Sequence, residues 1–505
     1  MTMALPCRAS SVRVGLLWGL AAACGLVLFQ DWRTAAVLGA ASLVALFFRF
    51  PFFGLLCVVT TVFVGTPTLK IPYLPGVATQ FFPAMLLLPP TLLGFLAAGA
   101  RPRVRFAAVR RENLTPLAPF VAAVLTLHLL AIAWAPHVEF ALGQAATLVF
   151  DVLLFFTLVI AVDSPRRLRT ACWTMVASAV LVCATMVLGA LYAWAGSIPL
   201  GTGAQLNFEL FSEERWGRIG GLCSANQAGG FLVFTTFLTL GLSRLYRRLA
   251  RVALCLLALT FLSFVVVSGS RGAILGFLGA SGLFMLCHAP TRRRLLSRST
   301  LLAVALLVAI LAGKPSFIDR MLVGFGYSGP LLFSEKKTSD SSSNVSGSGA
   351  RFRMWKQALG VMADEPGLMV LGLGPGGFIW HTGEPEVHSL WLAFFFDLGL
   401  AGGLVGLLGL TVLGTSVGAA LRRAPPGTPR TLFVAVVVAS LAEIGIHSLI
   451  DHDLTSPVSR FTWLYVALLA AALQVVRHCP PRPAPTDARL PAPGGAFAAP
   501  VAPGR

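Results

Sequence analysis

A histidine and two glycines mark the start of a long apolar run in the C-terminal third of the chain. His388-Ser389 opens this run, and Gly399 and Gly402 follow after nine intervening residues. A histidine at a boundary between water and lipid can stay neutral near neutral pH and accept a proton from a hydroxyl group. The small residues would let another helix approach closely. The alternative is a histidine that only makes hydrogen bonds at the membrane interface, with glycines that serve packing only.

Arginines beside two other apolar runs offer a chemistry that suits phosphate. Arg271 lies in the bend Ser268-Gly-Ser-Arg-Gly272, which is too short to carry it far from the ends of the two runs. Its guanidinium provides a fixed fork of donors, and Arg215 and Arg218 before a further run would help to hold a diphosphate. The alternatives are an arginine that binds lipid headgroups and a loop in which the other two pair with neighbouring glutamates.

A cluster of titratable residues ends the penultimate apolar run. It reads His447-Ser-Leu-Ile-Asp451-His-Asp453, and Glu443 lies one helical turn before His447 on the same face. We expect a polar, hydrogen-bonded helix end here. A metal site is the alternative, but the spacing matches no known ligand pattern well.

The composition shows which elements must position these residues. Of 505 residues, 56% are hydrophobic and 12% are charged, against roughly 45–50% and about 25% in soluble domains. Apolar runs of about 20 residues recur along the whole chain, as in helices that cross a membrane. This composition excludes a soluble enzyme, a secreted disulfide scaffold and a disordered regulator. It predicts an all-α polytopic membrane protein with about 12–14 transmembrane helices.

The apolar runs give approximate limits for these spans. The second and third runs are short, and the run that follows His388 is long enough to contain a break. The first run could pass for a signal peptide, but no convincing small-residue cleavage site follows it, so we expect a retained first span. The runs lie at 12–29, 34–48, 52–66, 79–99, 116–135, 141–162, 170–195, 222–242, 252–269, 272–288, 299–313, 388–418, 431–450 and 460–477.

The charge distribution predicts the orientation. The formal net charge is +19, from 39 basic and 20 acidic residues. When both termini are placed in the cytoplasm, about two thirds of the basic residues fall in cytoplasmic segments, as the positive-inside rule requires. The basic residues therefore set topology, and we expect no nucleic acid as partner.

Four regions follow from this topology. Residues 1–313 hold the N-terminal transmembrane helices with an outer loop at 196–221, and residues 388–478 hold the C-terminal ones. Between them, the long outer loop 314–387 contains a polar Ser-rich stretch and then an expected amphipathic helix at 350–363. Residues 479–505 form a Pro/Ala-rich tail, which we expect to be disordered and cytoplasmic. The helix places on one face Phe352, Trp355, Leu359 and Met362.

The motifs together resemble the superfamily of bacterial O-antigen ligases and O-antigen polymerases. His388-Ser389, nine residues and Gly399-x-x-Gly402 look like the ligase motif of that family, and Ser270-Arg271-Gly272 looks like its Ser-Arg-Gly motif. The segment from Arg351, followed by the turn Gly372-Leu-Gly-Pro-Gly, is similar to the outer-loop pattern before the motif histidine. Arg218 is similar to the arginine before a span, although Ser-Ala-Asn stands here where Asn-Pro-Asn is common.

This resemblance implies a GT-C-like polytopic fold, an active site on the periplasmic face of the bacterial inner membrane, and glycan transfer from undecaprenyl diphosphate. His388 would be the general base, Arg218 and Arg271 would bind the diphosphate, and Arg351 is a weaker candidate for that role. No metal and no other cofactor are expected. The donor would be an undecaprenyl-diphosphate-linked glycan, and the acceptor lipid A–core or a growing glycan. Supporting candidates are Arg215, Ser389, His447 and Asp451.

The sequence does not identify the acceptor, so two glycan-transfer functions stay open. A third possible function belongs to another class of protein. The first is an O-antigen ligase that joins the glycan to lipid A–core, and the second is a polymerase of O-antigen or exopolysaccharide. The third is a flippase or secondary transporter, which Asp151, Asp397 and Glu443 inside apolar runs would suit. The absence of visible repeats in the sequence disfavours it.

Overall fold

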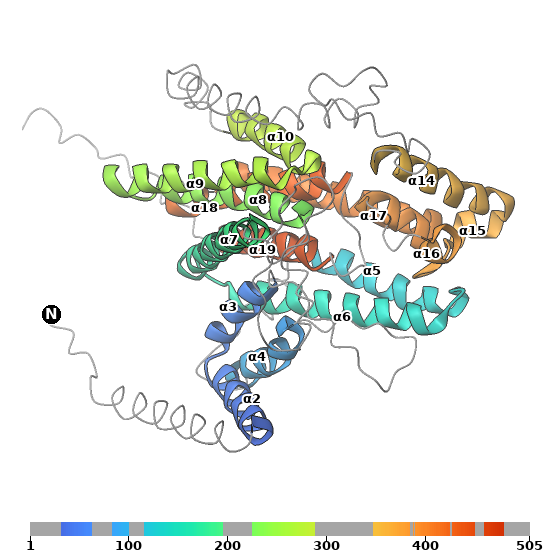
Figure 1. Cartoon of the computed structure of the whole chain (residues 1–505), viewed down its shortest axis with the longest axis horizontal. Helices are drawn as coiled ribbons and strands as arrows, with labels where there is room; N and C mark the ends of the chain where they lie inside the picture. The colour runs from blue at the N-terminus through green and yellow to red at the C-terminus, as the bar shows by residue number, and fades with distance from the viewer. Residues whose placement is uncertain are drawn as a thin grey trace, which may run out of the picture.

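A computed structural model describes the chain over residues 32–62, 83–99, 116–194, 225–287, 347–383, 387, 389–424, 427–449 and 459–478 (Figure 1). Within these residues the protein consists of helices and contains no β-strand. The protein is therefore an all-α polytopic membrane protein, as its composition predicts. The expected spans at 12–29 and 299–313, the whole loop at 196–221, and the tail lie outside the described residues.

The helices agree closely with the apolar runs of the sequence. The first group contains α2 (Trp32–Arg49), α3 (Pro51–Val62), α4 (Pro83–Gly99), α5 (Ala118–Ala131), the 3₁₀ turn η3 (Ile132–Trp134), α6 (Val138–Ala161) and α7 (Pro165–Trp194). The second contains α8 (Ala225–Ser243), α9 (Arg248–Ser268) and α10 (Arg271–Cys287). The third contains α14 (Gly347–Asp364), α15 (Pro366–Leu371), α16 (Gly377–Thr382), α17 (Leu390–Arg423), α18 (Thr428–Leu441), the π-helical turn η5 (Ala442–Ile446), the 3₁₀ turn η6 (His447–Leu449) and α19 (Ser459–His478).

Six of the described helices are long and apolar enough to cross a membrane. A seventh span is formed if Ala41–Arg49 and Pro51–Val62, which are bent by 120° at their junction, count as one. Pro51 explains the bend, because proline cannot continue the hydrogen-bond ladder of the preceding helix. Shorter apolar helices at Leu87–Ala97, Ala118–Trp134 and Arg271–Phe284 correspond to other expected spans.

Helix α8 forms the centre of the bundle. Nearly all of its described side chains are buried, and α7, α9, α10 and α18 pack around it. Its polar side chains bond within the helix, since the hydroxyl groups of Thr235, Thr236 and Thr239 donate to carbonyls one turn earlier. Phe234 stacks on Tyr465 of α19 with ring centroids 4.3 Å apart.

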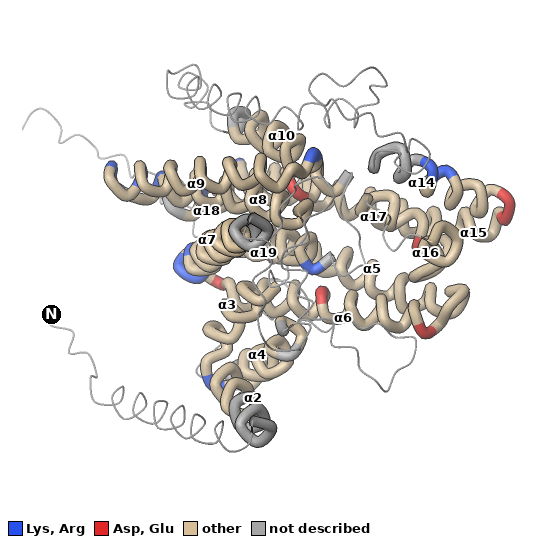
Figure 2. The backbone as a smooth tube through the Cα atoms, viewed as in Figure 1, with Lys and Arg blue, Asp and Glu red and all other residues tan. Residues whose placement is uncertain are grey.

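The two ends of the bundle differ in the charged residues that they carry (Figure 2). Basic residues gather at the ends of α7 and α9 that lie away from α14, α15 and α16 (Figure 2). These three helices form a cap at the opposite end, beside the start of α6 (Figure 1). The cap includes the helix expected at 350–363. Its buried face contains Ala358 and Met362, whereas Leu359, predicted on the same face, is 42% exposed. Met362 and Leu359 are three residues apart and share a side of the helix, with Met362 turned into the protein and Leu359 at its exposed edge.

Candidate functional site

The junction between α9 and α10 explains the Ser-Gly-Ser-Arg-Gly sequence. Gly269 ends α9 with a positive φ of 64°, a conformation that glycine adopts without strain. Ser270 then caps α10, because its hydroxyl oxygen accepts from the amide of Ala273 at 3.2 Å. Arg271 is consequently the first residue of α10, at the end of the helix where the partial positive charge of the dipole lies.

The start of α8 lies beside this junction. Gly229 approaches it so closely that a Cβ there would be 2.7 Å from Ser268 Oγ and 2.9 Å from Ser270 Cβ. The N-termini of α8 and α10 are thus adjacent, and both direct backbone N–H groups toward the same region. Two helix N-termini and a guanidinium in one place favour an anion.

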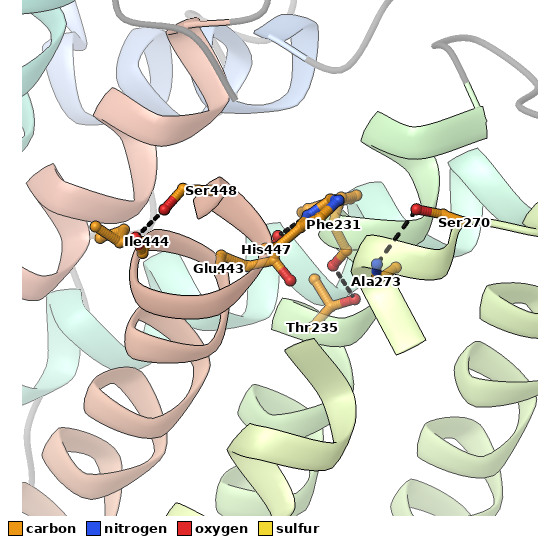
Figure 3. Close-up of polar contacts among 8 residues, drawn as sticks. All are labelled: Phe231, Thr235, Ser270, Ala273, Glu443, Ile444, His447 and Ser448. Carbon is orange, nitrogen blue, oxygen red and sulfur yellow. Dashed lines mark hydrogen bonds and ion pairs between the residues drawn. The ribbon is translucent and has the colours of Figure 1, made fainter. Parts of the chain in front are cut away.

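A buried carboxylate–imidazole pair lies against α8 and α10, close to this junction. Glu443 Oε2 and His447 Nδ1 are 2.7 Å apart, and both side chains are fully buried (Figure 3). Glu443 belongs to the π-helical turn η5, and His447 begins η6. Such turns are rare and occur frequently at functional sites. This contact confirms the prediction that Glu443 and His447 share a face at a hydrogen-bonded helix end.

Gly230 makes room for this pair, and Gly276 lies beside it at ordinary contact distance. A Cβ at Gly230 of α8 would be 2.5 Å from Glu443 Oε2 and 2.6 Å from His447 Nδ1. A Cβ at Gly276 of α10 would be 3.6 Å from Glu443 Oε1 and 3.6 Å from His447 Cβ. Gly276 is five residues after Arg271, which is about 7 Å along a helix. The pair therefore forms the floor beneath the adjacent N-termini of α8 and α10.

Helix α17 folds back on itself at Gly399. The backbone there has φ 61° and ψ −151°, which is open to glycine alone. A Cβ at Gly406 would be 3.4 Å from Phe394 Cδ2, although twelve residues of straight helix would separate the two by about 18 Å. Residues 390–398 thus run back along residues 400–423. The expected break is therefore confirmed. The motif glycines do let a helix approach closely, and that helix is residues 390–398, the segment directly before them.

The Gly-rich turn before the motif completes this reversal. Leu373 N–H donates to the carbonyl of Phe396 at 2.6 Å, and Gly374 N–H donates to that of Asp397 at 3.1 Å. The reversal frees these carbonyls from the α17 ladder, and they require other donors. A Cβ at Gly372, whose φ is +82°, would be 2.5 Å from the nitrogen of Gly399. The Gly372-Leu-Gly-Pro-Gly turn therefore packs directly against Gly399, the first glycine of the motif.

The residues on either side of His388 are held by two further hydrogen bonds. Trp355 of α14 donates its indole N–H to the carbonyl of Val387 at 2.8 Å, and Ser389 caps α17 by accepting from Leu392 at 3.5 Å. Both Val387 and Ser389 are 2% exposed. Residues 390–398 end at the reversal, so their start lies about 12 Å away from it along the helix, and α17 also contacts η6. The motif is therefore followed by a short buried helix that turns back at Gly399, which we call the re-entrant helix.

Asp397 has the helical partner that an intramembrane carboxylate requires. Its Oδ2 is 3.9 Å from Nε2 of His128 on α5, and both side chains are buried. His128 Nδ1 lies 3.0 Å from the carbonyl of Val124. The pair ties the reversal of α17 to α5. Asp151 of α6 is also buried, as predicted for a residue inside a span.

The structure brings together some of the predicted site residues. Arg271 and His447 contribute to the same region through α10, and Ser389 begins the re-entrant helix. Arg351 belongs to α14, and its side chain lies outside the described residues, as do all of Arg215, Arg218, His388 and Asp451. Among the described residues, no group of three His, Cys, Asp or Glu side chains is placed to hold a metal ion.

Several residues of the site were not identified from the sequence. Gly229 and Gly230 provide the close approaches, and Trp355 was assigned to an apolar face with no role toward Val387. His128 stood alone in an apolar run. The glycine doublet at 229–230 in the middle of an apolar helix was an available signal, because glycine there destabilises a helix unless a neighbour needs the space.

Comparison with protein families supports the same region. Residues 256–407 match the family described as O-antigen ligase. The matched segment includes most of α9, all of α10, the cap helices and the reversal of α17. This match confirms that the chain resembles the O-antigen ligase and polymerase superfamily. A comparison with curated proteins found no match.

Proposed function

We propose that the chain is an O-antigen ligase-type glycosyltransferase, which moves a glycan from undecaprenyl diphosphate to lipid A–core at the periplasmic face of the bacterial inner membrane. One observation carries the proposal: Arg271 starts α10 beside the N-terminus of α8, above the buried Glu443–His447 pair. In Figure 1 this region lies near the centre of the molecule, and α17 lies between it and the cap helices.

The diphosphate of the donor fits this region by charge. Arg271 offers a bidentate fork, and the two helix N-termini add backbone donors. Arg218 precedes α8 by seven residues in the chain and would supply a second guanidinium at the same end, with Arg215 next to it. Arg351 would approach from α14.

The transfer requires one proton acceptor and stabilisation of one leaving group. His388 would take the proton of the acceptor hydroxyl as its oxygen attacks the anomeric carbon. The bond between that carbon and the diphosphate oxygen then breaks, and lipid diphosphate leaves with its negative charge balanced by Arg271 and Arg218. A general base contributes roughly 10²–10⁴-fold to the rate, so positioning and the arginines supply the remainder.

The remaining candidates have supporting roles in this proposal. Ser389 fixes the start of the re-entrant helix, and His447 with Glu443 fixes the floor of the site. Asp451 follows four residues after His447 in the chain and would add a carboxylate to this polar segment. The reaction needs neither metal nor nucleotide, so transfer by the purified protein should persist in excess EDTA. Loss of transfer that Mg²⁺ restores would contradict metal independence.

A polymerase of O-antigen or exopolysaccharide is the second candidate, because the same motifs resemble both activities. A deletion strain distinguishes them. A ligase predicts accumulation of full-length lipid-linked polymer, whereas a polymerase predicts accumulation of single lipid-linked repeat units. Reconstitution of the purified protein with a lipid-diphosphate glycan and two competing acceptors, lipid A–core and a second lipid-linked glycan, identifies the acceptor directly.

Two experiments test the site and its orientation. His388→Ala should abolish transfer while the protein remains in the membrane, and retained transfer would rule out His388 as the base. The proposal places both termini in the cytoplasm with the basic helix ends. A reporter enzyme that is active only in the periplasm should therefore be inactive when fused to the C-terminus.

A further inference from the structure

We propose that Trp380 and His137 form an aromatic subsite for a sugar ring of the glycan, outside the site of transfer. This inference rests on the proposed function, because it assigns the ligand class of an extended part of the same substrate site. Trp380 lies on α16 and His137 directly precedes α6. Their ring centroids are 4.1 Å apart and their planes are inclined by 59°.

Trp380 is exposed, and the helix that carries it is held by neighbouring segments. Its side chain is 59% exposed, whereas Phe378, on the same short helix, is buried. Gln357 of α14 donates to the carbonyl of His381 at 2.5 Å, which fixes α16 to the cap helix. On the opposite side, a Cβ at Gly377 would be 3.7 Å from Pro136. The short helix that carries the ring is therefore held on two sides, and the ring lies against the imidazole of His137.

The chemistry of this surface suits a sugar. The face of an indole ring is apolar and carries partial negative charge, so it accepts the C–H face of a pyranose ring. The His137 imidazole lies beside the indole, and the exposed carboxylate of Glu139 follows two residues after His137. Both groups can bond to sugar hydroxyl groups. Helices that lie on membranes present Lys or Arg. Here the nearest charged residues in the chain are acidic: Glu139, Glu384 and Glu386.

The position of the platform requires a glycan longer than one sugar. Phe378 of α16 packs against Phe396 with ring centroids 5.4 Å apart, which places α16 at the outer end of residues 390–398. Ser389 and the flank of the motif histidine lie at the inner end, about 12 Å away along the helix. A single sugar ring at the site of transfer would not reach Trp380, whereas an oligosaccharide would.

The test compares donors of different length. For Trp380→Ala, the ratio of kcat/KM for a lipid-diphosphate donor of several repeat units to that for a single-unit donor should fall about tenfold, which corresponds to about 1.4 kcal/mol. Trp380→Phe, which keeps a ring, should recover most of the ratio. Leu359→Ala removes an exposed apolar side chain from the same cap and should leave the ratio unchanged.

An equal loss for both donors in Trp380→Ala would indicate a ring anchored in lipid and would overturn the proposal, as would an unchanged ratio. Binding is measured independently of transfer with a lipid-free oligosaccharide released from the polymer and the protein in nanodiscs. Saturation-transfer NMR should show contact that Trp380→Ala removes and Leu359→Ala keeps. If the wild-type protein binds the oligosaccharide but transfers nothing, the proposed function fails while the subsite stands; absence of binding overturns the subsite.

Discussion

The indole N–H of Trp355 donates to the backbone carbonyl of Val387 at 2.8 Å, and Val387 is the residue directly before His388. The bond joins residues 32 positions apart, from the cap helix α14 to the start of the re-entrant helix. On the other side of His388, Ser389 caps that helix. The residues on both sides of the motif histidine are therefore held by hydrogen bonds.

Trp355→Phe should lower transfer while the protein still accumulates in the membrane. Phenylalanine keeps an aromatic ring at this position but cannot donate to Val387. A hydrogen bond contributes about 1 kcal/mol, which is about fivefold in an equilibrium. Initial rates with purified protein measure the effect. Lys356→Ala changes the neighbouring exposed residue and should leave the rate within twofold, and equal rates for both variants would contradict the role of this bond.

Gly399→Ala should destabilise the folded protein. At φ +61° an added Cβ would meet the carbonyl of Val370 and the nitrogen of Gly372, and the backbone conformation alone costs about 1–3 kcal/mol in a residue other than glycine. The thermal midpoint in detergent should fall by several degrees, with a lower yield.

Gly403→Ala provides the matched control for this reversal. Gly403 is four residues further on in the same helix, and an added Cβ would meet only the ring of Phe395, at 3.8 Å. Since alanine favours a helix more than glycine does, the midpoint should be unchanged or slightly higher. Similar losses in the two variants would mean that α17 does not depend on a reversal at Gly399.

The sequence predicted the helices and the break in the run after His388. It could not predict which segments pack against the glycines at that break. Apolar runs and a glycine pair show that a long segment is interrupted, and the distance between Glu443 and His447 in the chain is enough to place them on one face. The contact between Gly372 and Gly399 brings the Gly-rich turn against α17 at the point where α17 reverses direction. One sequence contains no signal for such a pairing, because periodicity describes a helix face and not its neighbour.

The same limit applies to the partners of the buried charges. Asp397 was expected to pair with a neighbouring helix, but only the fold identifies His128 on α5. The π-helical turn η5 also has no signature in the sequence, since its residues would continue an α-helix equally well. Both features depend on packing between helices that are far apart in the chain.

Arg271→Lys should reduce transfer more than tenfold with normal protein levels. Lysine keeps the charge and the capped start of α10, but it loses the planar fork that binds a diphosphate in two places. Titration of the lipid-diphosphate donor should show a raised KM together with a lower kcat, because the leaving group gains charge in the transition state. Normal kinetics in this variant would indicate that Arg271 binds lipid headgroups.

Gly230→Ala should separate Glu443 from His447. The added methyl group would be 2.5 Å from the carboxylate and 2.6 Å from the imidazole, and disrupting a buried pair costs up to about 3–5 kcal/mol. Both the thermal midpoint and the transfer rate should fall, whereas Gly282→Ala on α10, where nothing lies within 4 Å, should change neither.

Glu443→Gln weakens the same pair without adding volume. If the methyl group acts through this pair, the double variant Gly230→Ala/Glu443→Gln should be less destabilised than the sum of the single changes. Full additivity would mean that Gly230 serves only the packing of α8.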